Sequence, residues 1–288
     1  MKNFDWIKIL KKAGHAGKKA ILRNYTAVNR HKIIKKGVGG DMTLRIDEVS
    51  EEAIHNSLKA DLGRSFVFLS EELGELQGQK NDEKLPIVVC DPLDGSHNAQ
   101  VGIPFFSLAL SVIYPGMKVG GRGFDNITAA LILSIKTDDE YSAIKGGGSF
   151  HNGTRLKPSK GDTSGRVQTM LVETSDVDYL REKILSKLSK KEIYKTRLLG
   201  SAALSYCMLA DRSAEALVFA QPGGARTIDS PAGYLIAREA GCVFSNLTEG
   251  HIKSVEDIEV GFSSRLNILG ASNQSILSEL EGKLVSLP

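Results

Sequence analysis

The stretch Ile87-Val88-Val89-Cys90-Asp91-Pro92-Leu93-Asp94-Gly95-Ser96 joins a buried strand to an abrupt turn that carries two acids. The apolar run before Asp91 is typical of a strand that is covered on both faces. Pro92 fixes its own backbone angle and cannot donate to a sheet ladder, whereas Gly95 permits a tight turn. We therefore expect the chain to leave the strand abruptly after Asp91, with Asp91 and Asp94 on one side of the bend.

Two carboxylates held this close repel each other unless a cation lies between them. The oxygens of Asp91 and Asp94, joined by the backbone carbonyl of Leu93, are hard ligands that suit magnesium. The amides of Gly95 and Ser96 follow the bend and would point at an anion if a helix or a nest begins there. This layout is typical of metal-assisted displacement at a phosphate. The alternative is that Asp91 and Asp94 only stabilise the turn, in which case they would need no metal.

Two further groups of acids also lie at the ends of expected elements. Glu71-Glu72 follows the apolar run 66–69, and Asp229 begins a helix after the glycine-containing segment 221–228. Each group has a structural explanation as well: Glu71 and Glu72 would suit a solvated face, and Asp229 would suit a helix N-cap. The coincidence of three such groups predicts a shared carboxylate cluster.

Helical and strand periodicities alternate along the rest of the chain. Loops are expected at 29–41 and 157–165, and a polar hairpin turn at 137–139. The pattern predicts a layered α/β or α+β fold in which residues 1–195 form an N-terminal lobe with most metal ligands and residues 196–288 complete the site. Helices are expected at 4–24, 46–60, 177–188, after 201, at 229–240 and up to 284, and strands at 66–69, 87–90, 105–113, 127–135, 140–145, 169–173, 216–220, 242–245 and 266–271.

The composition excludes several classes of protein. The chain has 288 residues, 37 basic and 34 acidic, and its net charge of +3 is too even to indicate a nucleic-acid-binding protein. No apolar stretch approaches the roughly 18–20 residues that span a bilayer, and the N-terminus lacks the apolar core of a signal peptide. Three sparse cysteines argue against a disulfide framework and for a reducing compartment. We expect a cytoplasmic protein with no membrane or nucleic-acid partner.

Taken in order, the motifs resemble the inositol monophosphatase superfamily, which includes archaeal enzymes that also hydrolyse fructose 1,6-bisphosphate. The resemblance covers nearly the whole chain. It implies a layered αβαβα sandwich, usually a homodimer, and a magnesium-dependent phosphomonoesterase that is commonly inhibited by lithium. The motifs that carry the resemblance are 40–47, Ser70-Glu71-Glu72, the Asp-Pro-Leu-Asp-Gly-Ser segment 91–96, 145–153, 200–203, 229–233 and 239–241.

The resemblance also assigns a role to individual residues, around two or three Mg²⁺ ions. It implies that the attacking water is oriented and deprotonated by Asp47 and Ser96 together with the ligand Glu71. Glu72 would either support the metal ligands from behind or bind a metal through a water. The implied ligands are Glu71, Asp91 and the Leu93 carbonyl for the first metal, and Asp91, Asp94 and Asp229 for the second. The implied phosphate and substrate contacts are Gly95, Ser96, Gly200, Ser201, Ala202 and Arg226.

Several positions depart from the family pattern. Ile228 stands where an aromatic residue is common, and Pro231 follows Asp229 at a position that suits the first turn of a helix. His97 would either touch the phosphate or cap a turn. Segment 221–226 lacks the acid that meets a substrate hydroxyl in inositol-type pockets, and Arg226 would either reach a second phosphate or lie at the surface. Similarly, Lys35 or Lys36 would either close over the site or belong to a solvated loop.

The substrate therefore stays open within one class of enzyme. The expected partner is a small phosphate ester: inositol monophosphate, fructose 1,6-bisphosphate or both, with 3′-phosphoadenosine 5′-phosphate or a dinucleotide phosphate as the alternative. A binding or regulatory protein that keeps the fold without turnover is the alternative from another class. Such a protein would have lost a metal ligand, and none is missing here.

Overall fold

The segment 87–94 forms β5 (Ile87–Asp94), a fully buried strand inside a large mixed sheet. The structure is a computed structural model, and it describes residues 4–36, 42–76, 85–115, 121–157, 167–248, 251–256 and 258–284. β5 runs parallel to β3 and antiparallel to β6. This eight-stranded sheet has the order β10-β9-β8-β7-β6-β5-β3-β4, with β3 (Val67–Ser70), β4 (Gly74–Leu76), β6 (Ser107–Ile113), β7 (Ile127–Ser134), β8 (Glu140–Ile144), β9 (Gly148–His151) and β10 (Thr154–Arg155).

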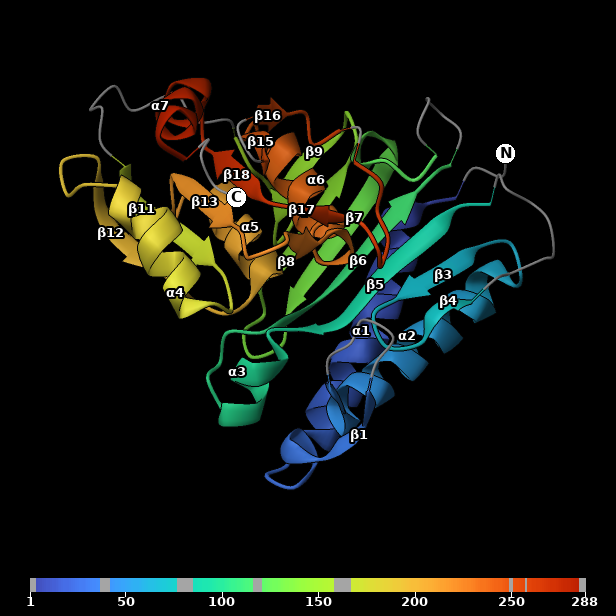
Figure 1. The fold of residues 1–288 in the computed structure, drawn as a ribbon. Helices are drawn as coiled ribbons and strands as arrows, with labels where there is room; N and C mark the ends of the chain where they lie inside the picture. The colour runs from blue at the N-terminus through green and yellow to red at the C-terminus, as the bar shows by residue number, and fades with distance from the viewer. Residues whose placement is uncertain are drawn as a thin grey trace.

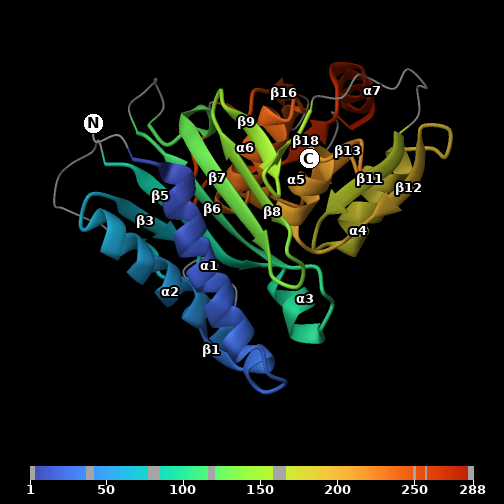
Figure 2. The same cartoon turned by 180° about the vertical axis from the view of Figure 1, so that it is seen from behind.

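Two long helices, α1 (Trp6–Asn24) and α2 (Arg45–Leu62), cover the outer face of this sheet (Figure 2). Their apolar sides pack with alternate residues of the strands, such as Val88 of β5 and Leu108 of β6, in one buried cluster. Gly17 of α1 lets the two helices approach closely, because a Cβ there would lie 2.7 Å from Ile54 Cγ1. The helix that carries Asp47 is thereby fixed against the sheet.

A second, six-stranded sheet lies on the other side of the molecule (Figure 1). It is parallel at β12-β11-β13 and antiparallel from β13 onward. Its outer face is covered by α4 (Val177–Tyr179) with the π-helical turn that follows it, and by α7 (Gln274–Leu284). The order is β12-β11-β13-β18-β15-β16, with β11 (Val167–Glu173), β12 (Ile193–Arg197), β13 (Ala216–Phe219), β15 (Val243–Thr248), β16 (His251–Lys253) and β18 (Ile268–Ala271).

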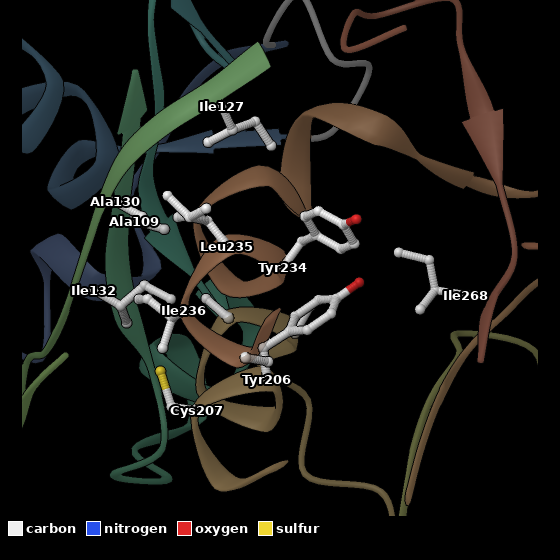
Figure 3. Close-up of a cluster of buried hydrophobic side chains, with 14 of the residues drawn as sticks. Ala109, Ile127, Ala130, Ile132, Tyr206, Cys207, Tyr234, Leu235, Ile236 and Ile268 are labelled. Carbon is white, nitrogen blue, oxygen red and sulfur yellow. The ribbon is translucent and has the colours of Figure 1, made fainter. Parts of the chain in front are cut away.

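Between the two sheets lie α5 (Ala202–Ala210) and α6 (Pro231–Glu239), which are buried along almost their whole length. Figure 3 shows Tyr206 of α5 and Tyr234 of α6 between strand residues of the first sheet, such as Ile132, and Ile268 of the second. The layers therefore run helix, sheet, helix, sheet, helix, which confirms the predicted αβαβα sandwich. Among the described residues, no helix is long and apolar enough to cross a bilayer.

The predicted long elements are present, and the differences fall on short ones. The expected helix 177–188 is a short α-helix that continues as π and 3₁₀ turns. The segment 29–41, expected to be a loop, contains β1 (Ile33–Lys36), and this strand pairs with β2 (Met42–Leu44) after it. The chain passes from one large sheet to the other between β10 and β11. The lobe boundary at 195/196 stays a prediction, and most of the expected loop 157–165 lies outside the described residues.

Candidate active site

A bulge in β5 places the two aspartates of the central motif on one face. Asp91 pairs with Ala109 and Asp94 with Ser107, so β5 has one more residue than β6 across this interval. Ser107 and Ala109 are two positions apart on β6, so their side chains face the same side of the sheet. Their partners Asp94 and Asp91 therefore face that side as well. The predicted exit after Asp91 is wrong, because the strand runs on through Asp94. Pro92 is accommodated in the bulge, where it needs no ladder partner.

Three of the predicted metal ligands converge beside this bulge. One carboxylate oxygen each from Glu71, Asp91 and Asp229 lies within 4.8 Å of the other two. Glu71 follows β3, which is parallel to β5, so both strands deliver an acid at the same edge. Asp229 ends a short 3₁₀ helix that leads into α6. The three acids line a cavity of about 500 Å³.

The electrostatics of the cluster favour a cation. Burial raises the pKa of Asp91 well above its usual value, and the neighbouring charges of Glu71, Asp94 and Asp229 raise it further. Asp47, at the first turn of α2, also lines the cavity, and Leu44 N donates to its Oδ2 at 2.6 Å. Its buried Oδ1 accepts no hydrogen bond from the described residues. Hard oxygen donors and an unpaired buried carboxylate oxygen fit a divalent ion with its water.

Asp94 is held in a different way from the three clustered acids. The first turn of α5 surrounds it: Ala202 N and Ala203 N donate to its oxygens at 3.0 and 3.1 Å, and the Ser201 hydroxyl donates as well. Ser107 Oγ donates at 3.2 Å. Burial raises the pKa of Asp94 to about 6, and these hydrogen bonds oppose the rise. Asp94 lines the cavity, and its place as a ligand of the second metal stays a prediction.

Two glycine turns from distant parts of the chain meet at the cavity wall. Gly95 has φ +81°, and a Cβ there would lie 2.9 Å from Gly200 O. α3 (Ser96–Val101) begins directly after Gly95, as the anion-site prediction required, and both Gly95 and Ser96 line the cavity. Gly200 and Ala202 also line it. Ser201 is buried, and its hydroxyl donates a hydrogen bond to Asp94.

The other predicted contacts fall in different places. His97 is exposed and is not among the residues that line the cavity. Glu72 is buried at the cavity wall and accepts a hydrogen bond from the Thr43 hydroxyl. Asp41 and the side chains of Lys35 and Lys36 lie outside the described residues.

Arg226 lies directly against the acid cluster. Its Nη2 is 2.5 Å from Glu71 Oε1, and its Nε is 3.4 Å from Asp229 Oδ2. Arg226 belongs to β14 (Ala225–Arg226), which pairs with β17 (Arg265–Leu266), so Arg265 lies opposite it on the same cavity wall. The predicted arginine is therefore at the site, in contact with metal-ligand candidates.

Glu173 is a cavity residue that the sequence analysis missed. It ends β11, is buried, and lines the cavity. Gly200 N donates to its Oε2 at 3.1 Å and Ser205 Oγ to its Oε1 at 2.6 Å, so it holds the start of α5. Burial raises the pKa of Glu173 to about 7. An acid at the end of a buried strand is the signal that singled out Asp91, and it applies to Glu173 equally.

Comparison with known proteins places this site in a family. The model of the inositol monophosphatase family matches residues 3–283. A fructose-1,6-bisphosphatase/inositol-1-monophosphatase of Methanothermobacter thermautotrophicus is 30% identical over 256 residues, which cover 86% of this chain and 87% of that protein.

More distant relatives agree with this match. A bifunctional NADP phosphatase/NAD kinase of Methanococcus maripaludis is 24% identical over 88% of this chain and 44% of its own length. A crystal structure described as an inositol monophosphatase–fructose 1,6-bisphosphatase superposes with a TM-score of 0.75, at 25% identity, over 96% of this chain and 100% of the other. The sequence motifs, the layered fold and the family match agree, and the chain belongs to the inositol monophosphatase family.

Proposed function

We propose that the chain is a magnesium-dependent phosphomonoesterase that hydrolyses a small sugar or polyol phosphate with an activated water. Family membership supports a phosphoric monoester hydrolase. The observation that carries the proposal is the convergence of Glu71, Asp91 and Asp229 on one cavity. Three carboxylates held this close favour a divalent ion among them, because its charge offsets their mutual repulsion.

Each residue around the cavity has a distinct part in the proposal. Bound Mg²⁺ would lower the pKa of water and offset the charge of the phosphate. Glu71, Asp91, Asp229, Asp94 and the Leu93 carbonyl would hold two or three such ions. Asp47 and Ser96 would orient the attacking water and take its proton, since Asp47 lines the cavity and none of the described residues donates to its buried Oδ1. The Gly95 and Ser96 amides would bind the phosphate, and the turn at Gly200–Ala202 would line the substrate pocket.

The substrate is proposed to be inositol monophosphate, fructose 1,6-bisphosphate or both. A cavity of about 500 Å³ accommodates a sugar ring with one or two phosphates. Arg226 and Arg265 on one wall favour a second anionic group. The alternative is a dinucleotide phosphate, which the NADP phosphatase relative supports, or 3′-phosphoadenosine 5′-phosphate. Phosphate release from a panel of these esters, with saturating Mg²⁺, would rank them.

The variant Asp91→Asn tests the function. We expect it to lower phosphate release by at least about a thousandfold, because it removes a charge that both metals share, with a circular dichroism spectrum like that of the wild type. Asp138→Asn, which changes an exposed acid in the β7–β8 turn, is the matched control. Turnover by Asp91→Asn near the wild-type rate would refute the metal assignment, as would full wild-type activity in excess chelator.

The surroundings of the enzyme are part of the proposal. Cys90, Cys207 and Cys242 are buried free thiols, which fits a reducing, cytoplasmic compartment. A homodimer, as is usual in the family, would be checked by light scattering during gel filtration. Lithium inhibition would be measured in the same phosphate-release assay.

A further inference from the structure

Arg226 spans two of the three clustered acids. It reaches Glu71 Oε1 through Nη2 at 2.5 Å and Asp229 Oδ2 through Nε at 3.4 Å. The side chains of Arg226, Glu71 and Asp229 are only 17%, 15% and 15% exposed. Ion pairs at this depth are screened less than surface pairs, so the guanidinium strongly offsets the charge of these acids.

The fold fixes Arg226 in this position independently of any ligand. Arg226 immediately precedes the 3₁₀ helix that ends in Asp229, so both side chains leave the same short turn. The β14–β17 pair holds the backbone of Arg226 against Arg265. Glu71 approaches from the eight-stranded sheet, directly after β3. The arginine therefore links two elements that the metal site also needs to link.

A divalent ion and this guanidinium would bind the same carboxylates. The ligand oxygens of Glu71, Asp91 and Asp229 lie within 4.8 Å of one another, and Arg226 already contacts an oxygen of two of these residues. A dication placed among those oxygens would repel the guanidinium beside it, and would compete with it for their lone pairs.

We propose that Arg226 is a positioning residue that holds Glu71 and Asp229 together before the metal arrives and releases them when the first divalent ion binds. Arg226 thereby keeps the acid cluster assembled in the metal-free protein, and it lowers the affinity of the cluster for the first divalent ion. This inference rests on the proposed metal site. It predicts that removing the arginine tightens metal binding, which is opposite to the effect of removing a residue that helps to form the site.

The test is calorimetric titration of the metal-free protein with Mn²⁺ and, separately, with Mg²⁺. We expect Arg226→Met to bind the first ion at least about fivefold more tightly than the wild type. Arg265→Met is the matched control, since it removes one positive charge from the same wall, and Arg265 donates to the carbonyls of Phe262 and Ser264. We expect Arg265→Met to change the affinity less than twofold.

Thermal melting gives a second readout that does not depend on turnover. In chelator, Arg226→Met should melt at a lower temperature than the wild type, because Glu71 and Asp229 then lose the guanidinium that offsets their charge. Saturating Mn²⁺ should raise its melting temperature by more than that of the wild type or Arg265→Met. If Arg226→Met does not fold without metal, Arg226→Lys replaces it, since one ammonium cannot span both acids, and its affinity should still exceed the wild-type value.

The outcomes separate this inference from the proposed function. Equal or weaker Mn²⁺ binding by the arginine variants overturns the inference, and so does an equal gain in Arg265→Met, which would reflect only the net charge of the wall. Absence of Mn²⁺ binding by the wild type, or unchanged binding by Asp91→Asn, would instead overturn the metal site and the inference with it.

Discussion

At the residue scale, the buried acids Asp91 and Glu173 have different surroundings. Asp91 ends the apolar run of β5 among other acids, and its charge calls for a cation. Glu173 ends β11 and accepts hydrogen bonds from Gly200 N and Ser205 Oγ. Glu173 therefore fixes the turn at Gly200 from the second sheet, while Asp94 holds the next residues of that turn from the first.

Replacing Glu173 by glutamine should change how stability depends on pH. Burial raises the pKa of Glu173 from 4.5 to about 7, so the folded state holds this proton more tightly than the unfolded state. The wild type is thus expected to lose stability as pH rises from about 4.5 to about 7, by an amount on the order of 3 kcal/mol. Glu173→Gln stays neutral and should escape that loss.

The measurement is urea unfolding of both proteins in chelator between pH 4.5 and 8. The free energy of unfolding of Glu173→Gln, minus that of the wild type, should rise across the window and level off above about pH 7. Glu52→Gln removes a carboxylate at an exposed position of α2 and serves as the control. A difference for Glu173→Gln that is constant with pH would contradict the expectation.

The sequence identified most residues of the cavity wall and fewer of their contacts. Asp91 and Asp229 could be predicted because strand ends and helix starts are visible as changes in periodicity. The pairing of Arg226 with Glu71 could not, since it depends on how β14 and β17 place a side chain next to a residue far away in the sequence. The hydrogen bonds of Asp94 to the start of α5 depend on tertiary packing in the same way.

At the element scale, the packing of α6 against α5 determines where Asp229 lies, because α6 follows Asp229 in the chain. Gly233 lies in its first turns and faces α5, where a Cβ would come within 2.5 Å of Tyr206 Cδ2. Figure 3 shows that this region is filled by Tyr206 and Tyr234 between the sheets. Because α6 begins at Pro231, shortly after Asp229, any shift of α6 away from α5 moves a metal-ligand candidate.

Gly233→Ala should therefore impair both stability and turnover. Overpacking against Tyr206 should lower the free energy of unfolding by about 1–3 kcal/mol. Displacement of Asp229 should lower kcat by about tenfold or more, since small misplacements of catalytic groups are costly. Urea unfolding and the phosphate-release assay measure the two effects.

Gly14→Ala is the matched control, because it overpacks α1 against Leu131 and Leu133 on the outer face of the first sheet. It should lose stability of similar or smaller size and keep the wild-type kcat. Equal losses of kcat in the two variants would show that α6 has no special link to the site.

The layers and the long helices could be predicted, and the short strands could not. The central helix α6 is apolar on all sides from Pro231 to Ala237, and Pro231 is a clear start signal. β12 carries mostly exposed residues and has no apolar run, so its pairing with β11 arises only from the assembled sheet. The π-helical turn at 180–184 likewise has no signature in the apolar periodicity.

At the scale of the whole molecule, the cavity is lined by residues of both large sheets, such as Asp91 of the first and Glu173 of the second. Glu71 and Asp91 come from the first sheet, whereas Asp229 belongs to the segment that leads into the helices between the sheets. In an unfolded chain these acids are far apart on average, so an ion bound by all three binds the folded state alone. Metal binding should therefore stabilise the entire fold.

Magnesium at a concentration of about 100 times its Kd should stabilise the protein by about 2.7 kcal/mol. For a chain of this size, that corresponds to a rise in melting temperature of roughly 4–5 °C. Differential scanning calorimetry with Mg²⁺ and then with excess chelator would measure the rise and its reversal. Asp91→Asn should show little rise, and an equal rise in that variant would mean that the stabilising ion binds elsewhere.

The extra residue in β5 makes a contribution that is separate from the sidedness of the two aspartates. If Leu93 were deleted, the acids would be two positions apart, and ordinary strand alternation would still present both toward the cavity. The shortened chain would lack one peptide unit between them, in an interval where Pro92 and Leu93 have no partners on β6. The insertion therefore adds a peptide unit next to the cavity that Leu93 lines, in an interval where the backbone is free of the regular pairing that an uninterrupted strand would make.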